Sequence, residues 1–185
     1  MTVRLTLVCH SFTTALTRAA FPADEPLTER GLRETAAATP PLHRAATAYS
    51  SPAPACTQTA TALGLTAHTD PALRDCDFGR WRGRTLNDVE QDEPDAINTW
   101  LTDPAANPHG GESILDVLTR AGHWLTQRAH HHSHQIAVTH PAIIRAALIH
   151  ALNAPPTTFW RIDVPPLARI TLTGQNTTWT LRLPT

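Results

Sequence analysis

The stretch Val3-Arg4-Leu5-Thr6-Leu7-Val8-Cys9-His10-Ser11 decides the fold. Residues 3–9 are rich in apolar residues and alternate in the manner of a strand, so they predict a buried first strand. His10 follows that strand directly. The segment Ile136-Ala137-Val138-Thr139 repeats this arrangement, because it predicts a strand that ends at His140. Ligands of α/β sheets gather at the carboxyl ends of strands, so we expect both histidines to face one pocket.

Helices and further strands alternate on either side of these two strands. Thr28 is a predicted N-cap, and a helix from there must end near Pro40. The apolar stripe that begins at Ile114 marks the clearest helix. Further strands are predicted at residues 46–49, 65–68, 167–172 and 178–183, and further helices at 54–63, at 93–101 and after Pro141. The alternation predicts a three-layer α/β sandwich with a mainly parallel central sheet, as one domain over residues 1–185.

Composition narrows the function classes. The 185 residues include 15 basic residues, all arginine, and 16 acidic ones, for a formal net charge of −1. A near-neutral chain has no basic field for nucleic acid or an anionic membrane, so neither partner is expected. No apolar run approaches the ~18 residues of a membrane helix, and the start lacks a signal-peptide pattern. We therefore expect a soluble, cytoplasmic protein that binds a small-molecule substrate, and the composition is compatible with a homodimer.

Six short segments, taken in order, carry a family resemblance. Val8-Cys9-His10-Ser11 resembles the Arg-His-Gly opening of the histidine phosphatase superfamily, also called phosphoglycerate mutase-like. The other blocks are Pro26–Gly31, Ser50-Ser51-Pro52 with Gln58-Thr59-Ala60, Leu73–Gly79 with Trp81 and Gly83, Gly111-Glu112-Ser113, and Val138-Thr139-His140. Each is weak alone, but the ordered set covers roughly residues 4–150. The resemblance implies the fold of that superfamily.

The resemblance also implies a mechanism without a cofactor. His10 would attack phosphorus and carry a phosphohistidine, Asp75 would protonate the leaving oxygen, and His140 would stabilise the transferring phosphoryl group. Such chemistry needs a neutral imidazole, a proton donor and cationic groups around the oxygens. The residues expected to bind the substrate are Ser11, Arg18, Arg82 and Arg145. Residues 84–111 are expected to cover the pocket and to set its specificity.

The chain departs from the family pattern where phosphate would be held. Cys9 stands at the arginine before the first histidine, and Ala55 stands at the second family arginine. Ser11 replaces a glycine, and Asp75 replaces a longer glutamate. Losing one preorganised donor typically costs ~10²–10³ in rate, so losing two could cost on the order of 10⁴ if nothing replaces them.

Two hypotheses follow. In the first, the chain is a divergent phosphatase that acts on a small phosphorylated metabolite through His10, with other arginines supplying the charge. In the second, it is a phosphatase-inactive descendant whose pocket serves non-phosphate chemistry or binds a small molecule or metal.

The metal form of the second hypothesis would use Cys9, His10, Asp75 and His140, a ligand set suited to zinc or cobalt. Successive strand residues face opposite ways, which argues against Cys9 and His10 sharing a site. The run from His130 to His134 is another metal candidate. It is more simply interpreted as a surface loop between a helix and a strand.

Overall fold

A sheet with the strand order β3-β2-β4-β1-β5-β6 forms the centre of the protein. The computed structural model describes residues 2–38, 47–130, 133–175 and 177–183. The strands are β1 (Val3–Cys9), β2 (Thr47–Ser50), β3 (Ala67–Thr69), β4 (His134–Thr139), β5 (Arg169–Gln175) and β6 (Thr178–Arg182). β1 to β4 are parallel, whereas β5 and β6 run antiparallel to their neighbours. The predicted α/β sandwich with a mainly parallel sheet is therefore confirmed.

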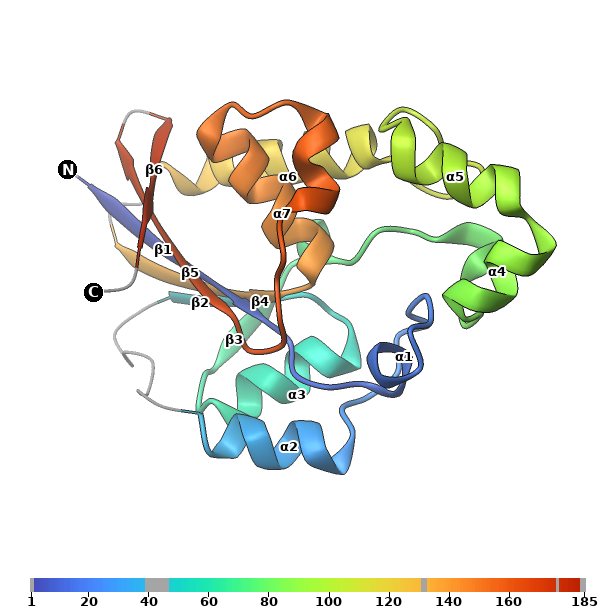
Figure 1. Cartoon of the computed structure of the whole chain (residues 1–185). Coiled ribbons are helices and arrows are strands. Elements are labelled where there is room, and N and C mark those ends of the chain that lie inside the picture. The colour runs from blue at the N-terminus through green and yellow to red at the C-terminus, as the bar shows by residue number, and fades with distance from the viewer. Residues whose placement is uncertain (1, 39–46, 131–132, 176, 184–185) are drawn as a thin grey trace.

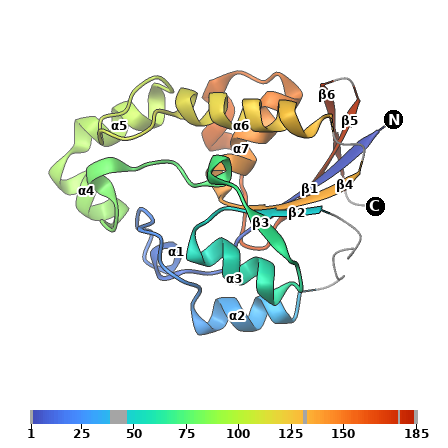
Figure 2. The same cartoon turned by 180° about the vertical axis from the view of Figure 1, so that it is seen from behind.

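Helices cover both faces of the sheet (Figure 1). α6 (Ile114–Arg128) and α7 (Pro141–Leu152) lie on one face, and α2 (Glu29–Ala36) and α3 (Pro54–Ala62) lie on the other. The view from behind shows the same three layers (Figure 2). The larger apolar core lies between the sheet and α6 and α7, and a smaller one joins the sheet to α3. Because both faces are covered, the central strands β1 and β4 are buried almost throughout, whereas β3 at the edge of the sheet is polar and largely exposed.

The two best-predicted helices begin at side-chain caps. The Thr28 hydroxyl accepts a hydrogen bond from the Gly31 N–H at the start of α2. Ser113 and Asp116 form a reciprocal capping box at the start of α6. Such caps satisfy N–H groups that have no partner inside the helix, and each contributes about 1 kcal/mol. Both helix starts were predicted from the sequence.

The register of β1 against β4 decides where the two histidines lie. Cys9 pairs with Thr139, so His10 and His140 leave the sheet side by side at its carboxyl edge. The His10 N–H donates to the Thr139 carbonyl at 2.9 Å. The Thr139 hydroxyl donates to the Leu73 carbonyl at 2.7 Å, which attaches the segment carrying Asp75 to the same edge.

Short elements surround this edge. They are α1 (Thr14–Thr17), α4 (Leu86–Asp92), α5 (Pro94–Thr102) and the 3-10 turns η1 (Pro71–Leu73), η2 (Gly79–Trp81) and η3 (Pro156–Arg161). The first tail strand, predicted from residue 167, begins at Arg169. In the described ranges, every helix is too short or too polar to cross a membrane.

Candidate active site

His10 lies just beyond the end of β1, with only 8% of its surface exposed. Its Nδ1 lies 2.8 Å from the Ser11 carbonyl oxygen. A carbonyl can only accept, so Nδ1 carries the proton and donates, and Nε2 of the neutral ring keeps its lone pair. Burial, and then the neighbouring His140, lower the pKa of His10 below its usual value. The ring is therefore neutral near pH 7 and has the form that a nucleophile needs.

His140 lies beside His10, and two groups of the protein contact its Nε2. The two ring centroids are 5.1 Å apart at an angle of 68°. Nε2 of His140 lies 2.9 Å from the Ser51 hydroxyl and 3.4 Å from the Cys56 sulfur. Both of these groups carry a proton, which favours Nε2 as the acceptor and places the ring proton on Nδ1. Burial lowers the pKa of His140 to about 4, so this ring is neutral as well.

Asp75 completes the group. Its Oδ2 lies 3.4 Å from Nδ1 of His140, a contact that is too long and poorly aligned to count as a hydrogen bond. Its Oδ1 accepts from the Cys76 N–H at 2.9 Å. Burial raises the pKa of Asp75 to about 6, although the Cys76 bond opposes the shift. A carboxylic acid with this pKa can give up a proton near neutral pH, as a general acid must.

The backbone that carries Asp75 is fixed by one arginine on α6. Arg120 donates to the carbonyls of Ala72, Arg74 and Asp75, and it forms an ion pair with Glu112 at 2.7 Å. Both partners of that pair are largely buried, with 13% and 15% of their side chains exposed. Arg120 therefore holds the irregular 72–75 segment in place without itself facing a ligand.

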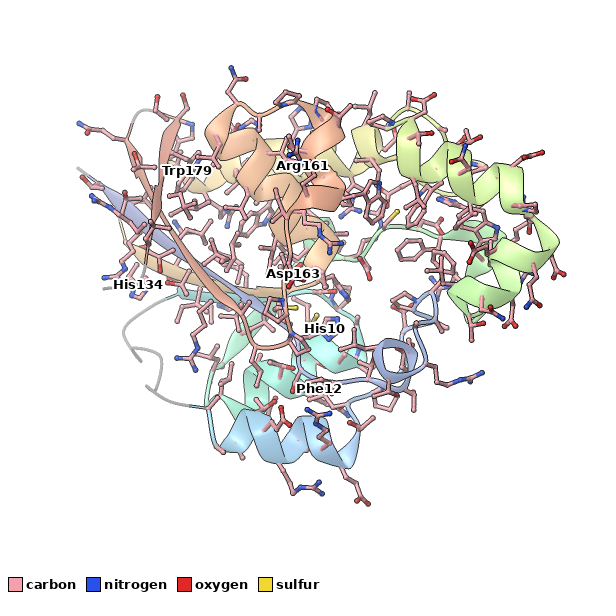
Figure 3. All side chains as sticks on the ribbon, in the orientation of Figure 1. His10, Phe12, His134, Arg161, Asp163 and Trp179 are labelled. Atoms are coloured by element: carbon pink, nitrogen blue, oxygen red, sulfur yellow. The ribbon has the colours of Figure 1, made fainter. Side chains whose placement is uncertain are left out.

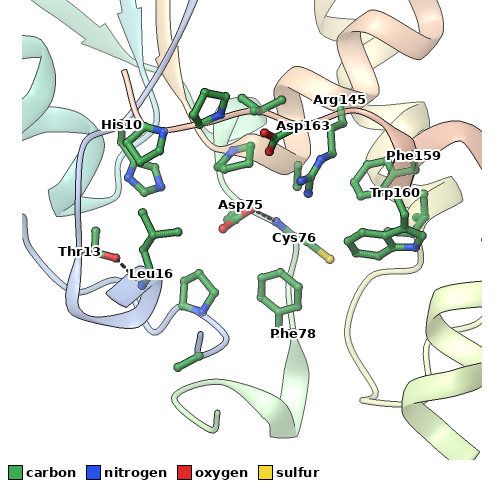
Figure 4. A pocket seen from close by; sticks show the side chains of 18 residues that line it. His10, Thr13, Leu16, Asp75, Cys76, Phe78, Arg145, Phe159, Trp160 and Asp163 are labelled. Atoms are coloured by element: carbon green, nitrogen blue, oxygen red, sulfur yellow. Dashed lines mark hydrogen bonds between the residues drawn. The ribbon is translucent and has the colours of Figure 1, made fainter. Parts of the chain in front are cut away.

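A cavity of about 460 Å³ opens in front of His10 and Asp75; we call it the apolar cavity. The side chains of His10, Asp75 and Arg145 reach it from three different elements, as Figure 4 shows. Most of the remaining wall is apolar, with Leu16, Phe78, Phe159, Trp160 and Val164 among its members. No residue of 84–111 belongs to this wall. The prediction that this segment covers the pocket and sets its specificity is therefore wrong, since η3 and the residues after it take that place.

A second cavity of about 400 Å³ lies on the other side of Asp75; we call it the polar cavity. Its wall includes Asp24, Ser51, Arg74 and Arg82. The Arg82 guanidinium pairs with Asp24 at 2.7 Å, and that of Arg74 pairs with Glu112 at 2.9 Å. Both arginines thus already have a carboxylate partner in the protein.

A narrow crevice lies directly over the two histidines, with Asp24, Glu25 and Ala55 in its wall. Burial pushes the pKa of Glu25 upward. Hydrogen bonds from Ala23, from its own N–H, and from Thr13 and Ala15 outweigh burial and keep that pKa below the usual value. The crevice therefore presents carboxylates to the histidines and has a methyl group, from Ala55, where the family pattern has an arginine.

The predicted substrate-binding residues separate into different places. Arg145 lies in the apolar cavity and Arg82 in the polar one. Ser11 was wrongly predicted, because it is fully buried and its hydroxyl donates to the Gly31 carbonyl at 3.0 Å. Its N–H donates to Thr59 at 3.1 Å. Arg18 was also wrongly placed, because it lines a neighbouring pocket with Gly83 and is absent from the walls that contain His10.

The alternative metal set is not assembled. Within the described ranges, no three His, Cys, Asp or Glu side chains are arranged to hold a metal ion. Cys9 belongs to the apolar core beside α7, and burial, with Asp75 next in effect, raises the pKa of its thiol to about 12. The expected alternation along β1 explains this. Of the other candidate, His131 and His132 lie outside the described residues, and His134 is at the far end of the sheet from His10 (Figure 3).

Comparison with known proteins agrees with this geometry. The chain matches the family model of the histidine phosphatase superfamily (branch 1) over residues 5–185. It is 40% identical over 58 residues to glucosyl-3-phosphoglycerate phosphatase of Mycobacterium tuberculosis, a match covering 31% of this chain and 26% of that protein. It is 41% identical over 61 residues to the bifunctional protein Rv2228c of the same species, covering 33% and 17%. The matched segments thus span about a quarter or less of these relatives.

Solved structures match over the whole chain. The structure titled mycobacterial hydrolase 1 superposes with a TM-score of 0.87 at 24% identity, covering 99% of this chain and 98% of that one. Mycobacterial glucosyl-3-phosphoglycerate phosphatase in complex with VO3 gives a TM-score of 0.84 at 25% identity, covering 97% of each. The family model and these superpositions agree on an α/β sandwich of the histidine phosphatase type. This chain belongs to the histidine phosphatase superfamily.

Several residues of the site were not predicted. Ser51 was quoted only as part of a motif, although its hydroxyl contacts His140. Trp160 and Asp163 lie in a tail segment without a recognisable pattern, yet both line the apolar cavity. Asp24 and Glu25, which line the crevice with the two histidines, could have been noticed in the sequence as two acidic residues just before the Pro26–Gly31 block.

Proposed function

We propose that this chain hydrolyses the phosphate ester of a small metabolite through a phosphohistidine at His10. The observation that carries the proposal is the pairing of His10 with Asp75. Nε2 of a neutral His10 and a carboxyl group with a pKa of about 6 line the same cavity. A nucleophile with a free lone pair and an acid that is partly protonated near neutral pH are the two groups that the reaction requires.

The two steps of the reaction balance as follows. Nε2 of His10 forms a bond to phosphorus while the bond to the ester oxygen breaks, and Asp75 gives its proton to that oxygen. Water then attacks the phosphohistidine, its proton goes to the Asp75 carboxylate, and the phosphorus–nitrogen bond breaks. His140, neutral and held by Ser51, lies beside Asp75, with its Nδ1 at 3.4 Å from Oδ2.

The test is a phosphatase assay on wild type, His10→Ala and the control His68→Ala, which changes an exposed histidine on β3. We expect His10→Ala to lower turnover by at least about 10³-fold, because the nucleophile is lost. We also expect a phosphoenzyme, quenched in alkali, from wild type and the control only. Turnover that survives in His10→Ala would exclude the phosphohistidine.

One observation favours a second candidate, a pocket that has lost phosphatase activity. Asp24 and Glu25 line the crevice over both histidines, and Ala55 leaves that crevice without a guanidinium. A phosphate dianion there would meet like charge. If no phosphoester is turned over by a protein with an intact fold, this candidate replaces the first.

A further inference from the structure

The wall of the apolar cavity indicates the chemical character of the uncharged part, or body, of its ligand. Phe78, Phe159 and Trp160 line it, and Trp160 is only half-buried beside the empty space. Its volume of about 460 Å³ lies within the range of small-molecule sites. An apolar ligand body is favoured here because its surface is removed from water. Hydroxyl groups of a sugar-like body would lose their hydration wherever they face the apolar part of the wall, which is most of it.

Arg145 indicates the charge of the ligand. Its Nε donates to the Ile162 carbonyl at 2.8 Å, which fixes the plane of the guanidinium. The same group lies over the rings of Phe159 and Trp160, at 5.6 and 5.7 Å from their centroids. Burial lowers the pKa of Arg145, but the group stays charged at neutral pH. In the described ranges, no carboxylate lies within 4.0 Å of it, in contrast to Arg74 and Arg82.

The remaining charges limit how much negative charge the ligand can carry. Asp163 stands exposed at the rim, and Asp75 is ionised above about pH 6. Figure 4 shows both carboxyl groups on the same side of the cavity as Arg145. A guanidinium with its outer nitrogens available can bind one carboxylate or phosphate group in a bidentate manner. A ligand with several anionic groups would meet the two carboxylates.

We propose that the apolar cavity binds a molecule with an aromatic or similarly apolar body and one anionic group, which Arg145 receives. This names the substrate class of the proposed phosphatase and in that sense rests on it. The anionic group is either the phosphate ester itself or a carboxylate elsewhere on the ligand. Binding of naphthyl probes that cannot be hydrolysed separates this proposal from the phosphatase chemistry, and the phosphate ester used as a control is titrated against His10→Ala so that it is not turned over.

The experiment is titration calorimetry with four probes. 2-Naphthoate and 2-naphthylmethylphosphonate carry the apolar body with a carboxylate or a phosphonate, 2-naphthylmethanol carries it without charge, and glucose 6-phosphate is the polar control. We expect the two anionic naphthyl probes to bind about 10- to 100-fold more tightly than the alcohol, as one charge-assisted contact allows. Glucose 6-phosphate should bind more weakly than either.

The variants assign the effect to Arg145. Arg145→Gln should weaken the anionic naphthyl probes by about 10- to 100-fold and the alcohol by less than about threefold. Arg145→Lys should recover part of the lost affinity, since lysine restores the positive charge but cannot make two parallel hydrogen bonds to one anionic group. Arg33→Gln, which removes an exposed arginine from α2, should change nothing. Trp160→Leu should weaken all three naphthyl probes alike.

The outcomes are distinct. Equal loss for the alcohol and the anions in Arg145→Gln would mean that Arg145 only supports the wall, and the proposal would be wrong. Tighter binding of glucose 6-phosphate than of the naphthyl probes, or no naphthyl binding by folded protein, would also overturn it. Binding of 2-naphthylmethylphosphonate alone assigns the anionic group to the phosphate. Binding of the naphthyl anions without any turnover supports the ligand class and contradicts the phosphatase.

Discussion

The two cavities on either side of Asp75 differ in how they use their arginines. On the polar side, Arg82 and Arg74 are joined to Asp24 and Glu112, so their charge is balanced inside the protein. On the apolar side, Arg145 is anchored through a backbone carbonyl, and Asp163 and Asp75 act on its charge without an ion pair within 4.0 Å in the described ranges. An arginine near the Asp75 carboxyl is therefore not by itself available to an anionic ligand. Whether such an arginine can bind an anionic ligand depends on whether a carboxylate of the same chain already forms an ion pair with it.

The largest expected effect is at Asp75, where the two cavities meet. Asp75→Asn removes the proton donor, so turnover of alkyl phosphates should fall by about 10³-fold. With 4-nitrophenyl phosphate, whose leaving group needs little protonation, the loss should be under about tenfold by the same reasoning. Steady-state kinetics on both esters measure this, with Asp95→Asn on α5 as the control. Equal losses on the two esters would mean that Asp75 is not the acid.

The second prediction concerns a substitution that adds a positive charge to the crevice over the two histidines. Ala55→Arg places a guanidinium beside Glu25 and the two histidines, and we expect kcat/KM for phosphomonoesters to rise by about 10²-fold. Ala55→Gln controls for the added volume, because Ala55 is only 4% exposed. Thermal unfolding of both variants checks the fold. No gain over Ala55→Gln would indicate that the phosphoryl group is not held in the crevice.

A third expectation concerns stability against pH. Folding raises the pKa of Asp75 from 3.8 to about 6, so the folded state favours the protonated acid and loses stability as pH rises from about 4 through 6. Two units correspond to about 3 kcal/mol as an upper bound. Asp75→Asn should therefore raise the melting temperature at pH 7.5, and the gain should disappear below pH 4. A constant gain at every pH would contradict the assigned pKa.

The smallest effect is expected on the polar side. The Arg82–Asp24 pair is 44% and 54% exposed, and such pairs contribute about 0–1 kcal/mol. Arg82→Gln should leave turnover within about threefold and stability within about 1 kcal/mol. A loss as large as that of Arg145→Gln would remove the distinction between the two cavities. Denaturant unfolding and the same phosphatase assay test it.

Local patterns in the sequence were sufficient for the parts of the site that strands position. His10 and His140 each follow an apolar strand, and parallel pairing brings the two strand ends together. The roles of Arg18, Arg82 and Arg145 depend on which carboxylate or carbonyl folds against each one, and no local pattern encodes that. Ser11 shows the same limit. It was expected to face substrate, but the close approach of α2 at Gly31 buries it.

The place of β1 in the sheet has a consequence for how the chain folds. β1 is made first, yet its neighbours are β4 at residues 134–139 and β5 at residues 169–175. Contacts between residues so distant in sequence form late, because the entropy cost of closing a long loop must be met before the contacts contribute any stability. During synthesis, His10 therefore has no pocket until most of the chain has left the ribosome. His10, although it lies early in the sequence, is thus among the last residues of the candidate site to reach its final surroundings.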